Sequence, residues 1–315
     1  MYVYKTLFAA AVALATIAST LVEASPIPAN AAVSNYVPVT KRMYTAEQVD
    51  QHEKILKRSS VGFNDWSCKP SSAHPRAIIL VHGLIANNWD NWLYMAPRLV
   101  ARGYCVYSLT YGQLPGIPLL AGLDKMENGA VQLSAFVDKV LAATNTTKVN
   151  LLGHSEGSLM PRYYLKYLGG SSKIDKFAAF GAIAYGTTLS GLVPFLTSLG
   201  LYDTIKGIID PVCLSCFQFL PNSQFLQDLN AGGDTVPGVQ YKFIVSKTDE
   251  VVTPYTSGLL KDKNPLVQNV VLQSLCPVDL SEHVAQMVDP IVFNAVDAYF
   301  NPARPQTINC LSAMT

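Results

Sequence analysis

Residues 149–164 read VNLLGHSEGSLMPRYY, and this stretch decides the fold. The apolar run Val149–Leu152 is typical of a buried strand, and the residues from Ser158 onward follow helical spacing. Between them stands Gly153-His-Ser-Glu-Gly157. A serine on a sharp turn between a strand and a helix projects its hydroxyl above the sheet, and small residues two positions away on each side avoid clashes with the neighbouring backbone. The stretch therefore predicts a strand–turn–helix unit that presents Ser155 as a nucleophile.

Strands and helices alternate along the rest of the chain. Strands are expected at residues 77–81, 104–110, 149–152, 177–185, 241–245 and 270–272, and helices at residues 89–102, 126–143, 158–168 and 290–300. This alternation predicts right-handed βαβ units, and so an α/β fold with a mostly parallel central sheet flanked by helices. We expect one domain over residues 59–315.

Residues 187–235 interrupt the alternation. Apolar residues recur there at helical spacing and are interleaved with charges, for example around Ile205, Ile208 and Asp210. An insertion of this size in a compact domain is usually functional, which favours a helical lid or cap. The alternative is a helix packed permanently on the core.

A serine hydroxyl is a weak nucleophile unless a base takes its proton and a carboxylate orients that base. In a fold of this kind the partners follow in the order serine, acid, histidine. His283 is the only histidine downstream of Ser155 and is therefore the expected base. His154 neighbours the serine, so its side chain is expected to point to another face of the turn and to pack there.

The expected acid is Asp249. It is the first carboxylate after the strand predicted at residues 241–245, and catalytic groups gather at the carboxyl ends of strands in such sheets. Glu250 and Asp279 are the competing carboxylates. The alternative reading of Asp249 itself is a solvated loop charge.

Acyl transfer also needs donors for the developing oxyanion. One is the backbone N–H of the residue after the nucleophile, here Glu156. The other is expected from the loop after the strand at residues 77–81, where Val81-His-Gly83 places the N–H of Leu84. An ordinary strand-ending turn is the alternative for this loop.

The first residues are typical of a targeting segment. An apolar, uncharged run follows one lysine, and small residues near Ala24 suit cleavage, so residues 1–24 are expected to be a secretory signal. Residues 25–58 carry prolines and the dibasic pairs Lys41-Arg42 and Lys57-Arg58, which leaves two readings, a propeptide or a flexible arm. We expect a secreted, extracellular protein without a transmembrane anchor.

In an oxidising compartment the six cysteines are expected to form disulfides, with 15 pairings open from sequence alone. Cys213 and Cys216 favour a local disulfide over zinc, because no histidine stands nearby to complete a metal site. Asn145 begins an N-glycosylation sequon.

Composition excludes several classes of protein. Of 315 residues, 50% are hydrophobic and 14% charged, and the formal net charge is +1. A nucleic-acid partner would call for a basic excess, and disorder for low hydrophobicity with high net charge.

Taken together, the chain resembles secreted triacylglycerol lipases of the class 2 type, within the α/β-hydrolase superfamily, from about Phe63 to Cys310. The motifs that carry the resemblance are Ile79-Leu-Val-His-Gly-Leu84, Gly103-Tyr-Cys-Val106, Thr110-Tyr-Gly112, Gly153-His-Ser-Glu-Gly157, Cys213-Leu-Ser-Cys216-Phe-Gln218, Phe225-Leu-Gln-Asp-Leu-Asn230, Thr248-Asp-Glu-Val-Val252 and Gln273-Ser-Leu-Cys276.

The resemblance implies an α/β-hydrolase fold and hydrolysis of carboxylic esters, with Ser155, Asp249 and His283 as the triad and without a metal or an organic cofactor. It also implies the disulfides Cys68–Cys105, Cys213–Cys216 and Cys276–Cys310. Leu84 replaces a polar residue common after this His-Gly pair, which should alter the pocket lining and leave the backbone donor in place.

A lipid or ester substrate at a lipid–water interface, and a monomeric protein, are the corresponding expectations for partners. The alternatives are an esterase or acyltransferase acting on short-chain, aryl or polyester substrates, and a non-catalytic binding module that kept the fold.

Overall fold

The computed structural model describes residues 62–115, 120–305 and 308–310. The signal expected at residues 1–24 and the propeptide or arm at 25–58 lie outside the described residues. The strands are β1 Ile78–Val81, β2 Val106–Leu109, β3 Val149–His154, β4 Ile174–Phe180, β5 Gln240–Val245 and β6 Val267–Val271. The α-helices are α3 Met95–Ala101, α4 Met126–Thr144, α5 Met160–Tyr167, α6 Leu192–Ser198, α7 Tyr202–Ile209, α8 Gln224–Asn230, α9 Leu272–Leu275 and α10 Pro290–Phe300.

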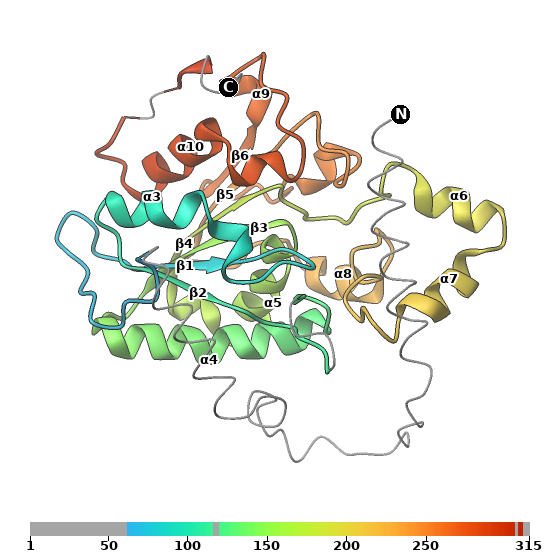
Figure 1. Ribbon diagram of the computed structural model, residues 1–315, viewed down its shortest axis with the longest axis horizontal. Helices are drawn as coiled ribbons and strands as arrows, with labels where there is room; N and C mark the ends of the chain where they lie inside the picture. The colour runs from blue at the N-terminus through green and yellow to red at the C-terminus, as the bar shows by residue number, and fades with distance from the viewer. Residues whose placement is uncertain (1–61, 116–119, 306–307, 311–315) are drawn as a thin grey trace.

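The six strands form one parallel sheet in the order β2-β1-β3-β4-β5-β6 (Figure 1). This confirms the predicted α/β class. In the register of the sheet, Val81 at the end of β1 pairs with Gly153 on β3, and Phe180 at the end of β4 pairs with Ile244 on β5. The carboxyl ends of these strands therefore meet at one edge, and the loops that follow them start side by side.

Apolar side chains alternate along β1 and divide the core between the two faces of the sheet. Ile79 and Val81 pack with α4, α5 and α8, whereas Ile78 and Leu80 pack with α3, α9 and α10. Figure 1 shows α4 below the sheet and α10 above it. Because both faces are covered, the strand reads as an unbroken apolar run, as buried parallel strands do.

Two predicted strands were placed wrongly along the chain. The strand expected at residues 177–185 is β4, Ile174–Phe180. The chain leaves the sheet at Gly181, where φ is +51°, and the N–H groups of Ala184 and Tyr185 bond to the carbonyl of Ser257. The strand expected at 270–272 is β6, whose polar residues at the sheet edge hid its start, and Leu272 begins α9.

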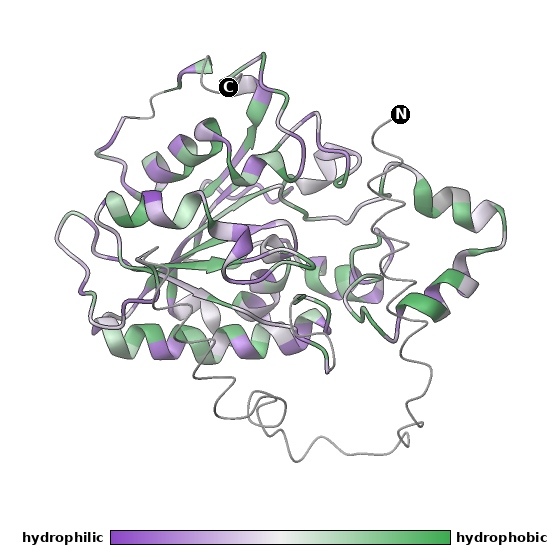
Figure 2. Cartoon of the chain, viewed as in Figure 1, coloured by the Kyte–Doolittle hydropathy of each residue, from purple (hydrophilic) through white to green (hydrophobic). Residues whose placement is uncertain are grey.

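The insertion at residues 187–235 contains α6, α7 and α8. Figure 1 shows α6 and α7 standing out from the body of the molecule, whereas α8 lies against it. Helix α7 has no buried residue, and Leu199, Leu201 and Ile208 are exposed. Figure 2 marks hydrophobic residues along both outer helices.

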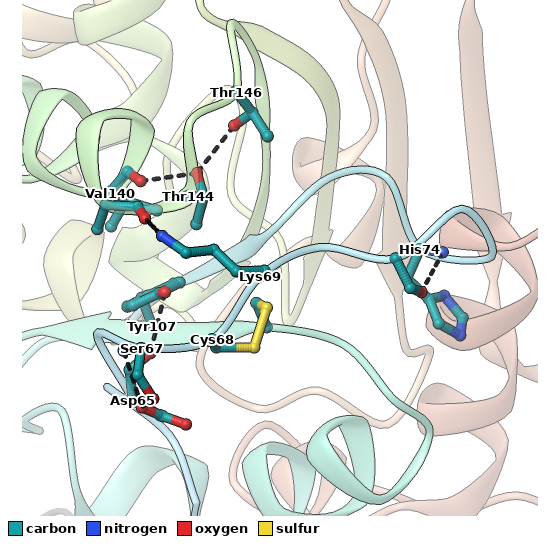
Figure 3. The surroundings of a disulfide bond; sticks show 12 residues. Asp65, Ser67, Cys68, Lys69, His74, Tyr107, Val140, Thr144 and Thr146 are labelled. Atoms are coloured by element: carbon teal, nitrogen blue, oxygen red, sulfur yellow. Dashed lines mark hydrogen bonds between the residues drawn. A yellow bond between two sulfur atoms is a disulfide. The ribbon is translucent and has the colours of Figure 1, made fainter.

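Three disulfides join the cysteines as Cys68–Cys105, Cys213–Cys216 and Cys276–Cys310. The first ties the segment before β1 to the start of β2, in a region where the Tyr107 hydroxyl donates to the Asp65 carbonyl (Figure 3). Over the described ranges, none of the helices has the length and apolar character that crossing a bilayer requires.

Candidate active site

The turn after β3 carries Ser155 in a backbone conformation that few residues other than glycine adopt, with φ of +54°. A Cβ atom on Gly153 would lie 1.9 Å from the carbonyl oxygen of Gly157, and one on Gly157 would lie 2.0 Å from the carbonyl oxygen of Val81. Both glycines are therefore required by close backbone contacts. The turn is followed by the 3-10 helix η3, Ser155–Ser158, and then by α5.

The three residues expected to act together lie in one chain of hydrogen bonds. The Nε2 atom of His283 is 2.9 Å from the Oγ of Ser155, and its Nδ1 is 2.8 Å from the Oδ2 of Asp249. The other carboxylate oxygen, Oδ1, accepts the backbone N–H groups of Val251 and Val252 at 3.0 and 2.8 Å. All three side chains are buried, with at most 7% of each residue exposed. This geometry suits transfer of the serine proton to the imidazole.

The competing carboxylates lie nearby but have other partners. An oxygen of Glu250 faces the backbone N–H of His283 at 3.4 Å, and Asp279 accepts the N–H of Ser281 at 2.8 Å. Burial, with the neighbouring Glu282, raises the pKa of Glu250. Among the described residues, the only carboxylate hydrogen-bonded to the His283 ring is that of Asp249.

The loop after β1 lies directly against the serine. A Cβ atom on Gly83 would be 3.0 Å from the Cβ of Ser155, so the chain can approach this closely only without a side chain. The N–H of Gly83 donates to the Asn91 side chain at 3.0 Å, so this amide already has an acceptor. The amide of Glu156 belongs to the first turn of η3, where backbone N–H groups have no acceptor within the helix.

The side chain of Glu156 points into the protein. It is fully buried, neither carboxylate oxygen accepts a hydrogen bond of ordinary geometry among the described residues, and its polar neighbour is Tyr111. Burial raises the pKa of this carboxyl well above its usual range. A carboxyl in such surroundings keeps its proton, because the ionised form would be desolvated without a counter-charge.

His82 and His154 are both buried and support the site from behind. The His82 ring stacks on the ring of Tyr111, and its Nε2 accepts the backbone N–H of Tyr111 at 3.2 Å. Burial lowers the pKa of His82 to about 4. His154 packs on Phe180, as expected of a supporting residue, but its ring lies only 5.1 Å from that of His283 rather than on a remote face.

Two side-chain amides at the site were missed by the sequence analysis. Asn91 holds the loop at Gly83, and its Oδ1 is 3.0 Å from the Nδ1 of His154. Gln286 donates to Asp249 at 3.1 Å. Neither belongs to a recognisable motif or follows a periodic pattern, so only the fold reveals them.

Two curated lipases are similar to part of this chain. A triacylglycerol lipase of Pseudarthrobacter phenanthrenivorans is 43% identical over 94 residues, which cover 27% of this chain and 27% of that protein. A triacylglycerol lipase of Burkholderia plantarii has the same identity over 94 residues, covering 27% of this chain and 24% of its own. The match thus spans about a quarter of each relative.

The fold is shared with solved lipases. The crystal structure of Aspergillus fumigatus lipase B superposes with a TM-score of 0.59 at 22% identity, covering 78% of this chain and 59% of that one. The mature form of the Bacillus licheniformis lipase BlEst2 superposes with a TM-score of 0.54 at 14% identity, covering 74% and 94%. The family model for class 2 lipases matches residues 75–293, which is more than half of the sequence. All the site residues described above lie within this range. The chain belongs to the class 2 lipase family.

Proposed function

We propose that this chain is a secreted carboxylic ester hydrolase that cleaves lipid esters through an acyl-enzyme on Ser155. The observation that carries the proposal is the continuous hydrogen-bonded path from Ser155 through His283 to Asp249. Membership of the class 2 lipase family and the names of the two bacterial relatives support the same chemistry.

In the first half-reaction His283 Nε2 takes the Ser155 proton as the oxygen attacks the ester carbonyl. The imidazolium then returns that proton to the leaving alcohol, and the acyl group stays on the serine oxygen. In the second half-reaction the same nitrogen activates water, which releases the acid. Asp249 holds the proton of Nδ1 in place and stabilises the transient imidazolium.

Charge develops on the carbonyl oxygen in both half-reactions. We assign its stabilisation to the backbone N–H groups of Leu84 and Glu156, on the two loops that meet at the serine. Losing one such donor costs about 3–4 kcal/mol in serine hydrolases. Because both donors are backbone groups, the leucine at position 84 does not remove one.

The insertion supports a lipid as the substrate. Its outer helices expose Leu199, Leu201 and Ile208, an arrangement suited to contact with acyl chains or a lipid surface. We assign residues 187–235 as the lid that binds acyl chains. The three disulfides and the exposed Asn145 of the sequon support secretion through an oxidising compartment.

The decisive test is Ser155→Ala in the purified protein. Hydrolysis of a soluble nitrophenyl ester should fall by about 10⁴-fold or more, because the nucleophile is lost. Ser172→Ala, at an exposed serine outside the site, is the matched control and should retain wild-type rates. Undiminished hydrolysis by Ser155→Ala would refute the assignment.

Initial rates on emulsified long-chain and dissolved short-chain esters test the substrate class. A lipase should accelerate when the substrate passes its solubility limit. Replacing Leu199 and Ile208 with glutamate should reduce that acceleration and leave the hydrolysis of dissolved esters unchanged. Leu93→Glu, an exposed leucine outside the insertion, serves as the control. Preference for dissolved esters with no acceleration would remove the lid from the proposal.

A further inference from the structure

Gln286 connects the acid of the candidate triad to the end of a central strand. It lies in the 3-10 helix η6, Ala285–Met287, three residues after His283, and is fully buried. Its Nε2 donates to Asp249 Oδ2 at 3.1 Å, and its Oε1 accepts the N–H of Gly181 at 2.9 Å. The oxygen it reaches on Asp249 is the one that also faces the imidazole.

The partners themselves determine which way the amide of Gln286 faces. The N–H of Gly181 can only donate, so the amide oxygen must face it, and the ionised carboxylate of Asp249 can only accept, so the amide nitrogen must face that group. A glutamine fills both positions at once. An aliphatic side chain of the same length would fill neither, and a carboxylate would meet Asp249 with like charge.

Gly181 forms the floor beneath the imidazole. A Cβ atom on this glycine would lie 3.1 Å from Cε1 and 3.2 Å from Nδ1 of His283. Its φ of +51° places its N–H toward Gln286. The side-chain amide of Gln286 therefore holds both Asp249 and Gly181, which lies beneath the His283 ring. Because Gln286 lies on η6, the same contacts also fix the segment that carries His283.

We propose that Gln286 is a positioning residue of the triad, which shares the Asp249 Oδ2 atom with His283 and so limits how strongly that carboxylate stabilises the imidazolium. The proposal rests on the function proposed above, because it concerns the same site.

Besides Asp249, the titratable groups that face His283 are Glu250, which accepts its backbone N–H, and His154, whose ring lies 5.1 Å away. Gln286 contacts neither of them, so the effect of its removal on pH dependence has one expected direction. A donor to Asp249 spreads the negative charge of the carboxylate and weakens its attraction for a protonated imidazole. Removing that donor strengthens the attraction, so the imidazolium persists to higher pH. The acid limb of kcat/KM, which reports the base of the free enzyme, should move upward.

The test is Gln286→Met, which keeps the length of the side chain and removes both hydrogen bonds. We expect kcat on a dissolved ester to fall about 10- to 100-fold, because a displaced acid and base no longer hold the reacting geometry, with KM nearly unchanged. The acid limb should move to higher pH. A change in packing alone would lower the melting temperature without moving the acid limb.

Gln273→Met is the matched control. Gln273 joins the loop that carries Asp249 to the loop that carries His283, since its side chain accepts the N–H of Lys247 and donates to the carbonyl of Asp279. It does not bond to Asp249 or His283 themselves. Its replacement should leave the acid limb in place. An unmoved acid limb in Gln286→Met, or the same displacement in Gln273→Met, overturns the proposal.

Gln286→Glu carries the test if Gln286→Met does not fold. It retains an acceptor for Gly181 and donates to Asp249 only while protonated, so a new loss of kcat toward alkaline pH is expected, and a wild-type profile overturns the proposal. NMR titration of the His283 ring in the resting protein reads the same displacement without turnover. Failure of the proposed function, seen as hydrolysis that survives Ser155→Ala, is therefore distinguishable from failure of this inference.

Discussion

Close backbone packing decides the geometry around Ser155. The flanking glycines touch backbone atoms of their neighbours, and the serine itself is in the left-handed region with φ of +54°. Such a conformation costs about 1–3 kcal/mol in a residue with a side chain and persists only where the surroundings impose it. Here the strand on one side and the helix on the other impose it, and the hydroxyl is left facing His283.

Gly157→Ala should destabilise the protein by more than about 4 kcal/mol, because the added methyl group would meet a carbonyl oxygen of β1 that cannot retreat. Gly207→Ala is the control. It lies within α7, has open space around it, and should gain about 0.5–1 kcal/mol from better helix propensity. Chemical denaturation of both variants measures the difference, and equal stability would contradict the account of the turn.

Glu156 makes stability depend on pH. Its pKa is raised on folding, so the folded state binds the proton more tightly, and the free energy of unfolding declines as pH rises above the ordinary value of 4.5. Glu156→Gln keeps the backbone N–H and abolishes this decline. The melting temperature of the variant, relative to wild type, should therefore increase from pH 4.5 toward neutrality. A difference that stays constant across this range would show that the carboxyl is not held protonated.

At the scale of elements, hydrogen bonds hold the C-terminal end of the insertion, near residues 230–234, to helix α5. Arg162 on α5, only 3% exposed, donates through Nε to the Asp234 carbonyl and through Nη1 to the Ala184 carbonyl, each at 3.1 Å, and it also donates to the side chain of Asn230. Helix α5, which follows Ser155 along the chain, thus holds the end of α8. Helix α7, in contrast, buries none of its residues.

Arg162→Met should cost about 3 kcal/mol or more, because it removes a buried charged group that donates three hydrogen bonds. The exposed Arg98→Met should cost less than about 0.5 kcal/mol. Thermal unfolding compares the two variants. Limited proteolysis of Arg162→Met should cut first near residues 230–235, and initial cleavage elsewhere would place the anchor at another point.

At the scale of the whole molecule, two disulfides close long loops and one closes a short loop. Cys68 and Cys105 are 37 residues apart, whereas Cys213 and Cys216 are 3 apart. Chain entropy assigns about 4 kcal/mol to the first and about 2 kcal/mol to the second. Replacing both cysteines of each pair with serine should lower the melting temperature more for the Cys68–Cys105 pair. The reverse order would show that strain or packing outweighs loop closure.

Much of this molecule follows from local pattern. Buried parallel strands are short apolar runs whatever their position, so the sheet, its parallel sense and the helices that cover it are readable from residues 77–300 without coordinates. The turn at Ser155 is equally local, because the two glycines and the serine stand within five residues. The sequence pattern does not show where β4 ends, because the loop at residues 181–185 is as apolar as the strand before it.

Chain order and the scarcity of histidines indicated His283, and the position after a strand favoured Asp249 over Glu250 and Asp279. Their proximity to Ser155 in space came only from the folded chain. Asn91 and Gln286 could be found only from the folded chain. They belong to no motif, and they matter because their side chains lie about 3 Å from His154 and Asp249, respectively. The burial of Glu156 is of this kind too. A local pattern can specify an element, since its physics spans a few residues, whereas hydrogen bonds between loops about 30 to 130 residues apart exist only once the sheet has brought its strand ends together.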